Sequence, residues 1–407
     1  MLTIGGEMIL NTMNLRQRVA NEGRSILTWW RKHALRNDGT FYGRVTTDCI
    51  PDPNADLGVI LATRILWTFS RAIHTGFEAS AENRHIIDSM WNMFKSAFWD
   101  QTHLGVFWMV DANQQPVQTR KHIYAQSFAM YACAEYYAAT GKQEALLYAQ
   151  LIYECIERYA RDSVHGGYFE SFSVDWRPMQ DQLGISDLAA PKSMNTHLHL
   201  LEAYTRLYQV WPNPELRDRL RDLLQVVATR IVNPQTSHFQ LFFDADWRPL
   251  SDVISYGHDI EGSWLLCEAA EALGDGACIQ ATRQLAVQMV DATLAEGLDA
   301  DGGLFNEGHA GRVIDDDKHW WPQAEAAVGL VNAYQITGNP EYFKQSERVW
   351  DFIEQHMSDR QYGEWYWLVD RSGNPDKTKW KVEPWKCPYH NTRACLELWQ
   401  RLAPEGE

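Results

Sequence analysis

The stretch KHIYAQSFAMYACAEYYAATGKQEALLYAQLIYECIERYARDSVHGGYFESF, residues 121–172, contains the unit from which we predict the fold. Its first part, 121–140, has apolar and small residues on almost every side, which predicts a helix buried all round. Its second part, 144–160, has one apolar stripe and a charged face, as expected of an outer helix. A glycine–aromatic element follows at 166–172. The stretch therefore predicts an inner helix, an outer helix and a tight connection to the next unit.

The same unit recurs along the chain. Taking one residue of each glycine–aromatic element as a marker, the elements are separated by 65, 61, 73, 64 and 61 residues. The six markers are Tyr42, Phe107, Tyr168, Leu241, Phe305 and Tyr366. A period of this kind indicates a repeat architecture, because one unit cannot bury its apolar face without its neighbours.

Two helical patterns lie between successive markers. Patterns of the inner type occupy 58–74, 121–140, 193–211, 258–274, 319–338 and 389–402. Patterns of the outer type occupy 14–35, 83–99, 144–160, 215–232, 278–297 and 342–357. We therefore predict an all-α fold, an (α/α)6 barrel of six inner and six outer helices with short β-hairpin-like connections, forming a single domain over residues 1–407. An open helical solenoid is the alternative, and six copies of similar period favour closure.

Composition limits the classes of partner. The net charge is −16, which argues against nucleic acid or an anionic membrane, because both bind basic surfaces. We find no signal peptide and no apolar run long enough for a transmembrane helix. The seven cysteines are scattered without a CxxC pair, which indicates free thiols in a reducing cytoplasm. The 18 tryptophans fit either a large aromatic core or a site for flat sugar faces.

A candidate site lies where the inner helices begin. If these helices run parallel, their N-terminal ends meet at one mouth of the ring, and each repeat can contribute one residue. Equivalent positions near the start of the six inner patterns hold polar or aromatic residues: Arg64, Tyr124, Asn195, His258, Trp321 and His390. One such residue is usually a cap or a hydrogen-bonded core group, whereas six in phase indicate a site.

Helical spacing selects further residues of this site. Asn195 and His199 are four apart and share a helix face, so we predict both in the pocket and His197 as structural. His258 and Glu261 are three apart, so the carboxylate can orient the imidazole, while Asp259 points elsewhere and needs to be no more than a first-turn acid. HxxE is a weak metal signal and no HExxH motif occurs, so we predict no metal and no other cofactor.

The last inner pattern adds His390 and Arg393, again three apart on one face. Its repeat is separated from that of His258 by one repeat, so the two imidazoles can face each other across a pocket. One of Trp320 and Trp321 is expected in the core, and the other, with Trp385, can offer flat faces to pyranose rings.

Two opposed imidazoles suit inversion at a carbon next to a carbonyl, because one base removes a proton from one face and the other returns it to the opposite face. Both should have a pKa near neutrality for this task. Donors to the enediolate oxygens would be Arg64, Tyr124 and Asn195. Glycoside hydrolysis is the second mechanism, since it needs a carboxylate pair, for which the chain offers Asp187, Glu261 and Glu325.

Five segments carry a resemblance to a known family: ATRILWTFS at 62–70, KSMNTHLHLLEAYTRLY at 192–208, YGHDIEGSWLLCEAAEALG at 256–274, HWWPQAEAAVGL at 319–330 and KVEPWKCPYHNTRACLE at 381–397. Over nearly the whole chain the sequence resembles the N-acylglucosamine 2-epimerase superfamily, and within it the cellobiose 2-epimerase branch. The resemblance implies an (α/α)6 barrel that epimerises the reducing-end glucose or mannose of a β-1,4-disaccharide at C2, reversibly and without a cofactor.

The resemblance also implies residue roles. His258 and His390 would be the two acid–base residues, acting through a cis-enediolate, and His199 would assist ring opening or hold O1. The residues that would bind and polarise the sugar are Arg64, Tyr124, Asp187, Asn195 and Glu261. Trp321 and Trp385 match stacking positions, and Trp385 favours a disaccharide because it offers a platform for a second ring.

The alternatives differ in substrate and in chemistry. Mannose 2-epimerases and mannose isomerases share the fold and most of the histidines but act on monosaccharides, and a non-catalytic sugar-binding protein could use the same ring. In each case we expect a small sugar as the ligand of a monomer or homodimer, with no nucleic-acid or membrane partner.

Overall fold

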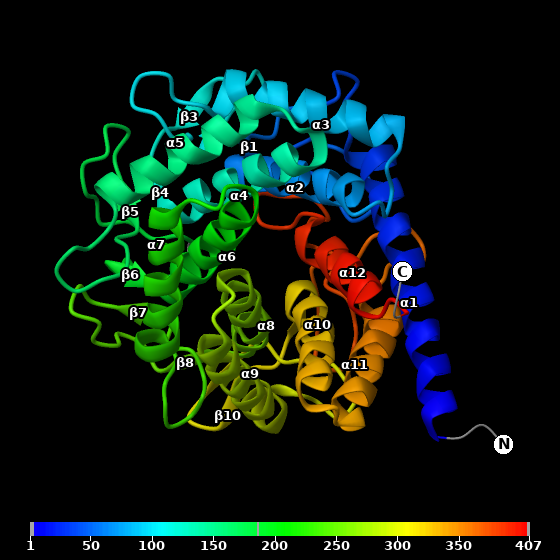
Figure 1. Ribbon diagram of the computed structural model, residues 1–407. Coiled ribbons are helices and arrows are strands. Elements are labelled where there is room, and N and C mark those ends of the chain that lie inside the picture. Colours follow the sequence, from blue (N-terminus) through cyan, green and yellow to red (C-terminus); the bar gives the residue numbers. More distant parts are fainter. Residues whose placement is uncertain (1–3, 185–186, 405–407) are drawn as a thin grey trace.

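The computed structural model describes residues 4–184 and 187–404, and it is a ring of helices in two layers (Figure 1). Six inner helices surround the centre of the ring, and six outer helices cover them from outside. The predicted (α/α)6 barrel is confirmed. The inner helices are α2 (Val59–His74), α4 (Ile123–Thr140), α6 (Met194–Val210), α8 (Tyr256–Leu273), α10 (Trp320–Thr337) and α12 (Tyr389–Arg401). The outer helices are α1 (Ile4–Trp29), α3 (Ala81–Met93), α5 (Gln143–Tyr159), α7 (Pro214–Val226), α9 (Gly276–Gly297) and α11 (Pro340–Phe352).

Contacts between helices explain why the ring closes. Each inner helix packs on the next, and α12 packs on α2, so the last repeat meets the first. The inner helices are buried along nearly their whole length because neighbours lie on both sides and an outer helix lies behind. The N-terminal helix α1 packs on the C-terminal helix α12. The sixth outer helix thus comes from the opposite end of the chain to the inner helix that it covers. The open solenoid is therefore excluded.

The glycine–aromatic elements are tight hairpins that follow the outer helices. Outer helices α1, α3, α7 and α11 are each followed by a π-helical turn. An antiparallel β-bridge then closes the hairpin, as between Trp99 and Val106 or between Ser358 and Trp365. The hairpins turn through left-handed backbone, which a glycine such as Gly105 (φ +71°) adopts without steric cost. Gly105 also has no room for a Cβ, which would lie 2.7 Å from Gln126 Oε1.

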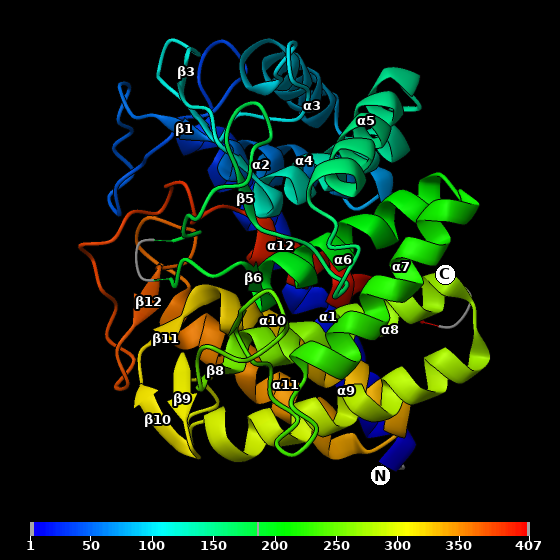
Figure 2. The ribbon, with the colours of Figure 1, turned by 90° about the vertical axis from the view of Figure 1, so that its left-hand side faces the viewer.

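Short strands join neighbouring repeats on one face of the ring, the left-hand side of Figure 2. In each pair, the segment before an inner helix pairs antiparallel with the hairpin of the next repeat, and Val45 bridges Val382 to link the last repeat to the first. These strands are β1 (Leu57–Gly58), β2 (Met109–Val110), β3 (Pro116–Gln118), β4 (Lys121–His122), β5 (Ser171–Phe172), β6 (Lys192–Ser193), β7 (Phe242–Phe243), β8 (Val253–Ser255), β9 (Glu307–His309), β10 (Arg312–Asp315), β11 (Lys318–His319) and β12 (Leu368–Val369).

Buried lysines fix the same hairpins. Lys192 lies two residues before α6, and its ammonium contacts Asp162 of the preceding hairpin at 2.7 Å and lies over the Phe169 ring. Equivalent pairs are Lys121 with Asp100, Lys318 with Asp299, and Lys381 with Asp359. Each lysine pairs with a carboxylate and stacks on hairpin aromatics, because a buried ammonium without a partner would be costly.

The fourth residue of an inner helix holds the hairpin behind it. Gln126 of α4 bonds both the N–H and the C=O of Val106, and His197 of α6 accepts from the N–H of Tyr168. His197 is thus structural, as predicted. Asp259 of α8 has the same role: it is fully buried and accepts from the N–H of Phe239. Asp259 is an acid of the first turn of α8, as predicted, but it is more than that, because it also fixes the hairpin through Phe239.

The far end of the ring, where the inner helices end, is closed by ion pairs. Position 13 of an inner helix places Glu135 of α4 beside Arg206 of α6, with Arg206 Nε at 2.6 Å, and His74 Nδ1 lies 2.8 Å from the same carboxylate. Arg401 of α12 contacts Glu268 of α8 at 3.1 Å. This end therefore holds charge in pairs, whereas the histidines predicted for the site lie in the first two turns of their helices, at the other end.

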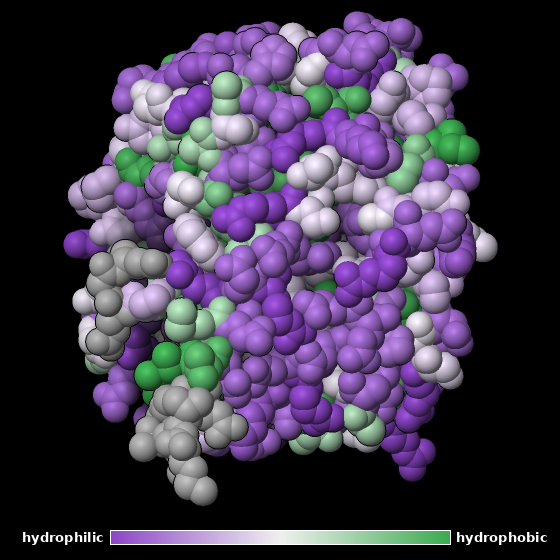
Figure 3. Space-filling model, turned by 90° about the vertical axis from the view of Figure 1, so that its right-hand side faces the viewer, coloured by the Kyte–Doolittle hydropathy of each residue, from purple (hydrophilic) through white to green (hydrophobic). Residues whose placement is uncertain are grey.

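The outer surface is largely hydrophilic on the face shown in Figure 3, with an apolar patch near the N-terminal end, where Ile9, Leu10 and Met13 of α1 are exposed. In the described part of the chain no helix has the length and apolar character needed to cross a bilayer. All seven cysteines fall within this part, and all are free thiols.

Candidate functional site

The first ring of the site stands at the start of the inner helices. Tyr124, Asn195, Trp321 and His390 are each the second residue of their helix, and His258 is the third of α8. The structure therefore brings five of the six in-phase positions to one mouth. Arg64 is the exception, because it is the sixth residue of α2 and lies one turn deeper. Its guanidinium still reaches the ring, since Arg64 Nη2 donates to the Tyr124 hydroxyl at 2.7 Å.

A second ring lies one helical turn below the first. His199, Glu261 and Glu325 are each the sixth residue of their helix, level with Arg64, and Arg393 is the fifth of α12. A spacing of three or four residues returns a side chain to the same helix face, so each of these four residues stands below a first-ring residue of its own helix.

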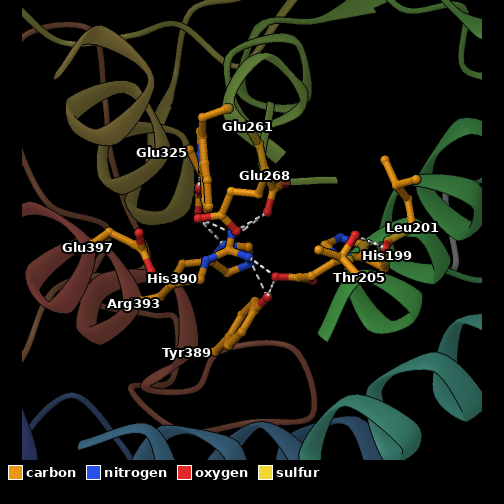
Figure 4. A network of polar contacts seen from close by, with 12 residues as sticks. His199, Leu201, Thr205, Glu261, Glu268, Glu325, Tyr389, His390, Arg393 and Glu397 are labelled. Atoms are coloured by element: carbon orange, nitrogen blue, oxygen red, sulfur yellow. Dashed lines mark hydrogen bonds and ion pairs between the residues drawn. The ribbon is translucent and has the colours of Figure 1, made fainter. Parts of the chain in front are cut away.

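A charge network joins the two rings around Arg393 (Figure 4). His390 Nδ1 lies 2.6 Å from Glu325 Oε1, and Arg393 Nη2 donates to the same oxygen at 2.7 Å. Arg393 Nη2 also donates to Glu261, and its Nη1 donates to Glu202. One guanidinium thus holds three carboxylates that come from α6, α8 and α10. His390 and Arg393 share a helix face, as predicted, and both side chains contact Glu325.

His199 is held by a carboxylate of its own helix. Its Nδ1 lies 3.0 Å from Glu202 Oε2, and Glu202 also accepts from the Tyr389 hydroxyl and from Arg393. Because Nδ1 is engaged, Nε2 is the ring nitrogen left for a ligand. The Tyr124 ring stands edge-on to the imidazole, with centroids 5.1 Å apart.

His258 is held differently from the prediction. Its Nδ1 lies 2.7 Å from the Ser255 hydroxyl, three residues earlier, whereas Glu261 turns to Arg393. The expectation that Glu261 orients the His258 ring is therefore wrong. Residues three apart share a face, but the positive charge of Arg393 attracts the carboxylate more strongly than a neutral imidazole does.

Trp321 of α10 contacts both imidazoles of the first ring, which come from the neighbouring helices α8 and α12. Its ring centroid is 4.6 Å from that of His258 and 5.6 Å from that of His390. Trp320 points into the core, with 3% of its surface exposed, as expected of one tryptophan of this pair. Trp385 is half-buried beside Tyr124, with centroids 5.9 Å apart, so its free surface borders the mouth.

Burial controls the ionisation of the site. It lowers the pKa of His258 to about 3, with His199 and Arg64 adding to the effect, and it lowers the pKa of His390 well below the usual value. The expected pKa near neutrality is therefore wrong for both imidazoles. Burial raises the pKa of Glu325 to about 7, with Arg393 offsetting part of the rise. Burial and then Glu325 raise the pKa of Glu261 to about 7.

One set of described residues has the ligand spacing of a metal site. Ligand atoms of Glu261, Glu325 and His390 lie within 4.8 Å of one another. Arg393 Nη2 contacts both carboxylates, so an arginine already supplies the positive charge that a metal would supply. This arrangement fits an ion-pair network better than a coordination site.

A cavity of about 350 Å³ opens beside His258. Three predicted residues line it, namely Asp187, Asn195 and His258, together with Glu170, Ser255 and Glu307 among others. The buried Oδ1 atom of Asn195 accepts no hydrogen bond from the described protein atoms, which leaves it for a ligand hydroxyl. A larger surface cavity of about 660 Å³ lies on the other side of β8, around His238 and His309, and contains none of the predicted residues.

The chain is similar to known proteins in both sequence and structure. The sequence model of the family described as N-acylglucosamine 2-epimerase matches residues 39–394. This chain belongs to the N-acylglucosamine 2-epimerase family. The cellobiose 2-epimerase of Bacteroides fragilis is 41% identical, covering 92% of this chain and 95% of that enzyme, and that of Dictyoglomus turgidum is 36% identical, covering 93% and 96%. The structure of cellobiose 2-epimerase from Bacillus thermoamylovorans matches with a TM-score of 0.89 at 36% identity, covering 95% of this chain and 100% of that one.

Three residues of this family member's site escaped the sequence analysis: Glu202, Ser255 and Tyr389. A signal existed for two of them, because Glu202 and Ser255 stand three residues from His199 and His258. The same HxxE spacing occurs at His199–Glu202 and at His258–Glu261, yet only the first is a contact. Tyr389 gave no signal of this kind, since its partners come from α6 and its own helix.

Proposed function

We propose that this chain is a cofactor-independent sugar 2-epimerase that interconverts glucose and mannose at the reducing end of β-1,4-disaccharides such as cellobiose and lactose. The observation that carries the proposal is the pair of imidazoles, His258 and His390, at one mouth of the ring, both in contact with Trp321. Each imidazole uses Nδ1 for a protein partner, which leaves Nε2 for the sugar. The cellobiose 2-epimerases that resemble the chain over nearly its full length support the substrate class.

The reaction needs proton transfer on both faces of C2. After the sugar ring opens, one imidazole takes the C2 proton and leaves an enediolate, whose negative charge lies on O1 and O2. Rotation about the C2–C3 bond then presents the other face, and the second imidazole returns a proton there. The donors for the enediolate oxygens are Arg64, Tyr124 and Asn195, and positioned donors of this kind stabilise developing charge. His199, held by Glu202, is positioned to move the ring-opening proton.

The unequal surroundings of the imidazoles support a proposal of unequal tasks. His258 is neutral at physiological pH and contacts only a hydroxyl through Nδ1, so its unprotonated Nε2 is available to accept the C2 proton. His390 contacts Glu325, whose pKa of about 7 lets it hold a proton. When His390 Nε2 gives its proton to C2, Glu325 can give a proton to His390 Nδ1. The His390 imidazole then stays neutral. We therefore infer that Glu325 and Glu261 store the proton that His390 delivers, and that the reverse reaction returns it to them.

The same contacts argue against hydrolysis. A glycosidase needs a free carboxylate pair, one as an acid and the other as a base or nucleophile. Glu261 and Glu325 are both bonded to Arg393, so neither is free, whereas Asp187 lines a different part of the site, the cavity beside His258, together with Glu170 and Glu307. No specific contact favours hydrolysis or aldose–ketose isomerisation over epimerisation.

The test is incubation of the protein in D2O with cellobiose, lactose, glucose and mannose, followed by 1H NMR. We expect the 2-epimer of each disaccharide, with deuterium at C2. Faster interconversion of glucose and mannose than of the disaccharides would make the chain a mannose 2-epimerase, and fructose would make it a mannose isomerase. Recovery of unchanged sugars throughout, or release of glucose from cellobiose, would contradict the proposal.

A further inference from the structure

The last repeat enters its inner helix differently from the others. In three repeats the buried hairpin lysine lies two residues before the inner helix: Lys121 before α4, Lys192 before α6 and Lys318 before α10. Lys381 pairs with Asp359 in the same way, but it lies eight residues before α12. The last repeat therefore has additional residues between its hairpin anchor and the helix that carries His390.

These additional residues and the start of α12 include a segment, 385–390, that contacts the site along most of its length. The Trp385 ring borders the mouth at one end of the segment, and the His390 imidazole stands in the first ring at the other end. The contacts of the segment with the site are, in chain order, Trp385 with Tyr124, Cys387 with Arg64, Tyr389 with Glu202 and His390 with Glu325.

Lys386 ties this segment to the hairpin of the same repeat. Its side chain is fully buried, and Nζ contacts Glu364 Oε2 at 2.6 Å and lies 5.3 Å from the centre of the Trp320 ring. Lys386 and Glu364 are 22 residues apart, as are Lys381 and Asp359. The second ion pair thus repeats the hairpin anchor five residues further along the chain, where its lysine belongs to segment 385–390.

Glu364 stands at a position that is glycine in two other hairpins. It directly precedes the bridging residue Trp365, and its backbone is left-handed (φ +63°), as at Gly105 and Gly167. A Cβ at either glycine would lie 2.7 Å from the inner-helix side chain that holds its hairpin. Left-handed backbone is strained for a glutamate but not for a glycine, and such strain persists where the surroundings fix the residue. The contacts of the Glu364 carboxylate supply this fixation.

The Glu364 carboxylate joins three parts of the last repeat. Oε1 accepts from Asn391 Nδ2 at 2.6 Å, and Oε2 accepts from Lys386 and from the backbone N–H of Trp365. Asn391 follows His390 in α12, so one carboxylate holds the hairpin, segment 385–390 and the first turn of α12. Removing either charge of the pair would leave the other buried without its partner, which is strongly unfavourable.

We propose that Lys386 and Glu364 are positioning residues of the epimerisation reaction: their buried ion pair fixes segment 385–390, and thereby holds the Trp385 platform and the His390 imidazole in their places at the mouth. The inference rests on the proposed function, because it takes His390 as an acid–base residue and Trp385 as the platform for the second sugar ring. Both side chains of the pair are fully buried, so neither touches the sugar.

Loss of the pair has two consequences for the kinetics. Displacing the Trp385 ring face removes about 50 Å² of apolar contact with the second sugar ring, which weakens binding about eightfold. A shift of His390 by about 1 Å lowers turnover by up to about 100-fold, because proton transfer needs a near-attack geometry. We therefore expect KM for cellobiose to rise about eightfold and kcat to fall at least about tenfold.

The experiment compares the double variants K386M/E364Q and K381M/D359N in the full chain. Lys381 and Asp359 are the matched control, because they also form a buried ion pair at 2.6 Å but hydrogen-bond within the hairpin. Both double variants should lose folding stability in urea titrations. Only K386M/E364Q should raise KM for cellobiose, measured by 1H NMR of the 2-epimer, and Kd, measured by titration calorimetry.

These two constants distinguish positioning from stability. An unfolded fraction lowers the apparent kcat but leaves KM and Kd unchanged. E364Q alone replaces the double variant if that variant does not fold, because glutamine fills the same space and keeps an acceptor for the Trp365 N–H.

The outcomes also separate the two proposals. If the wild type binds cellobiose without epimerising it, the proposed function fails, and the Kd values still decide whether the pair positions the Trp385 platform. If the wild type binds no cellobiose, both proposals fail. KM and Kd of K386M/E364Q within about twofold of wild type would overturn the inference. An equal rise of KM in K381M/D359N would overturn it as well, because any buried ion pair of this repeat would then have the same effect.

Discussion

Glu325→Gln tests the inferred proton store with a change of one group. Glu325 Oε1 contacts His390 Nδ1 and Arg393 Nη2, and Oε2 accepts from Trp264 Nε1 at 3.1 Å, so glutamine fits the space but cannot release a proton. Loss of a charge-assisted hydrogen bond costs about 1.5–3 kcal/mol. At about 1.36 kcal/mol per tenfold in rate, kcat for cellobiose should fall about 10- to 150-fold.

The pH dependence gives a second measurement. In the wild type, kcat should fall as the pH rises above about 7, because Glu325 and Glu261 then lose the stored proton. In Glu325→Gln the negative charge that raises the pKa of Glu261 is gone, so this alkaline decline should move to lower pH.

Glu268→Gln is the matched control. Glu268 is a half-buried carboxyl group whose pKa is also raised to about 7, but it contacts Arg401 at the far end of α8. We expect its pH profile to match that of the wild type. A Glu325→Gln enzyme with kcat within about twofold of wild type and an unshifted decline would refute the proton store.

Three further predictions concern the first ring, the far end of the barrel and metal. Gly257→Ala places a Cβ 2.6 Å from the Trp321 ring, so kcat/KM should fall although alanine favours a helix; unchanged activity with an unchanged near-ultraviolet spectrum would contradict this. Burial opposes the ionisation of Glu135, but Arg206 and Arg71 lower its pKa from 4.5 to about 2. The ionised carboxylate therefore stabilises the fold by about 3 kcal/mol above pH 4.5, and this stabilisation is lost as the pH falls from 4.5 to 2. Urea titrations across that range should show the loss in wild type and a flatter profile in Glu135→Gln. Dialysis against EDTA should leave epimerisation intact, because Arg393 neutralises the carboxylates; inactivation restored by a divalent cation would refute this.

The sequence predicted the fold in detail because its evidence is local. Burial all round at 121–140 and one apolar stripe at 144–160 distinguish inner from outer helices, and the glycine–aromatic elements mark where each repeat ends. The phase of the repeats also placed Tyr124, Asn195, Trp321 and His390 at one mouth. The phase misplaced Arg64 by four residues, which is one helical turn. The repeats vary in length by more than four residues, so their period cannot locate a residue to within one turn.

What the sequence by itself determined, then, is the ring, its mouth and the residue types that face it. Only the tertiary structure decided the partners. Spacing of three residues predicted a contact between His258 and Glu261, but Arg393 arrives from the last helix and takes that carboxylate, which leaves His258 to Ser255. Ion pairs and pKa shifts depend on distance and burial in three dimensions, where the first and last repeats are neighbours, and a helical period contains no information about either.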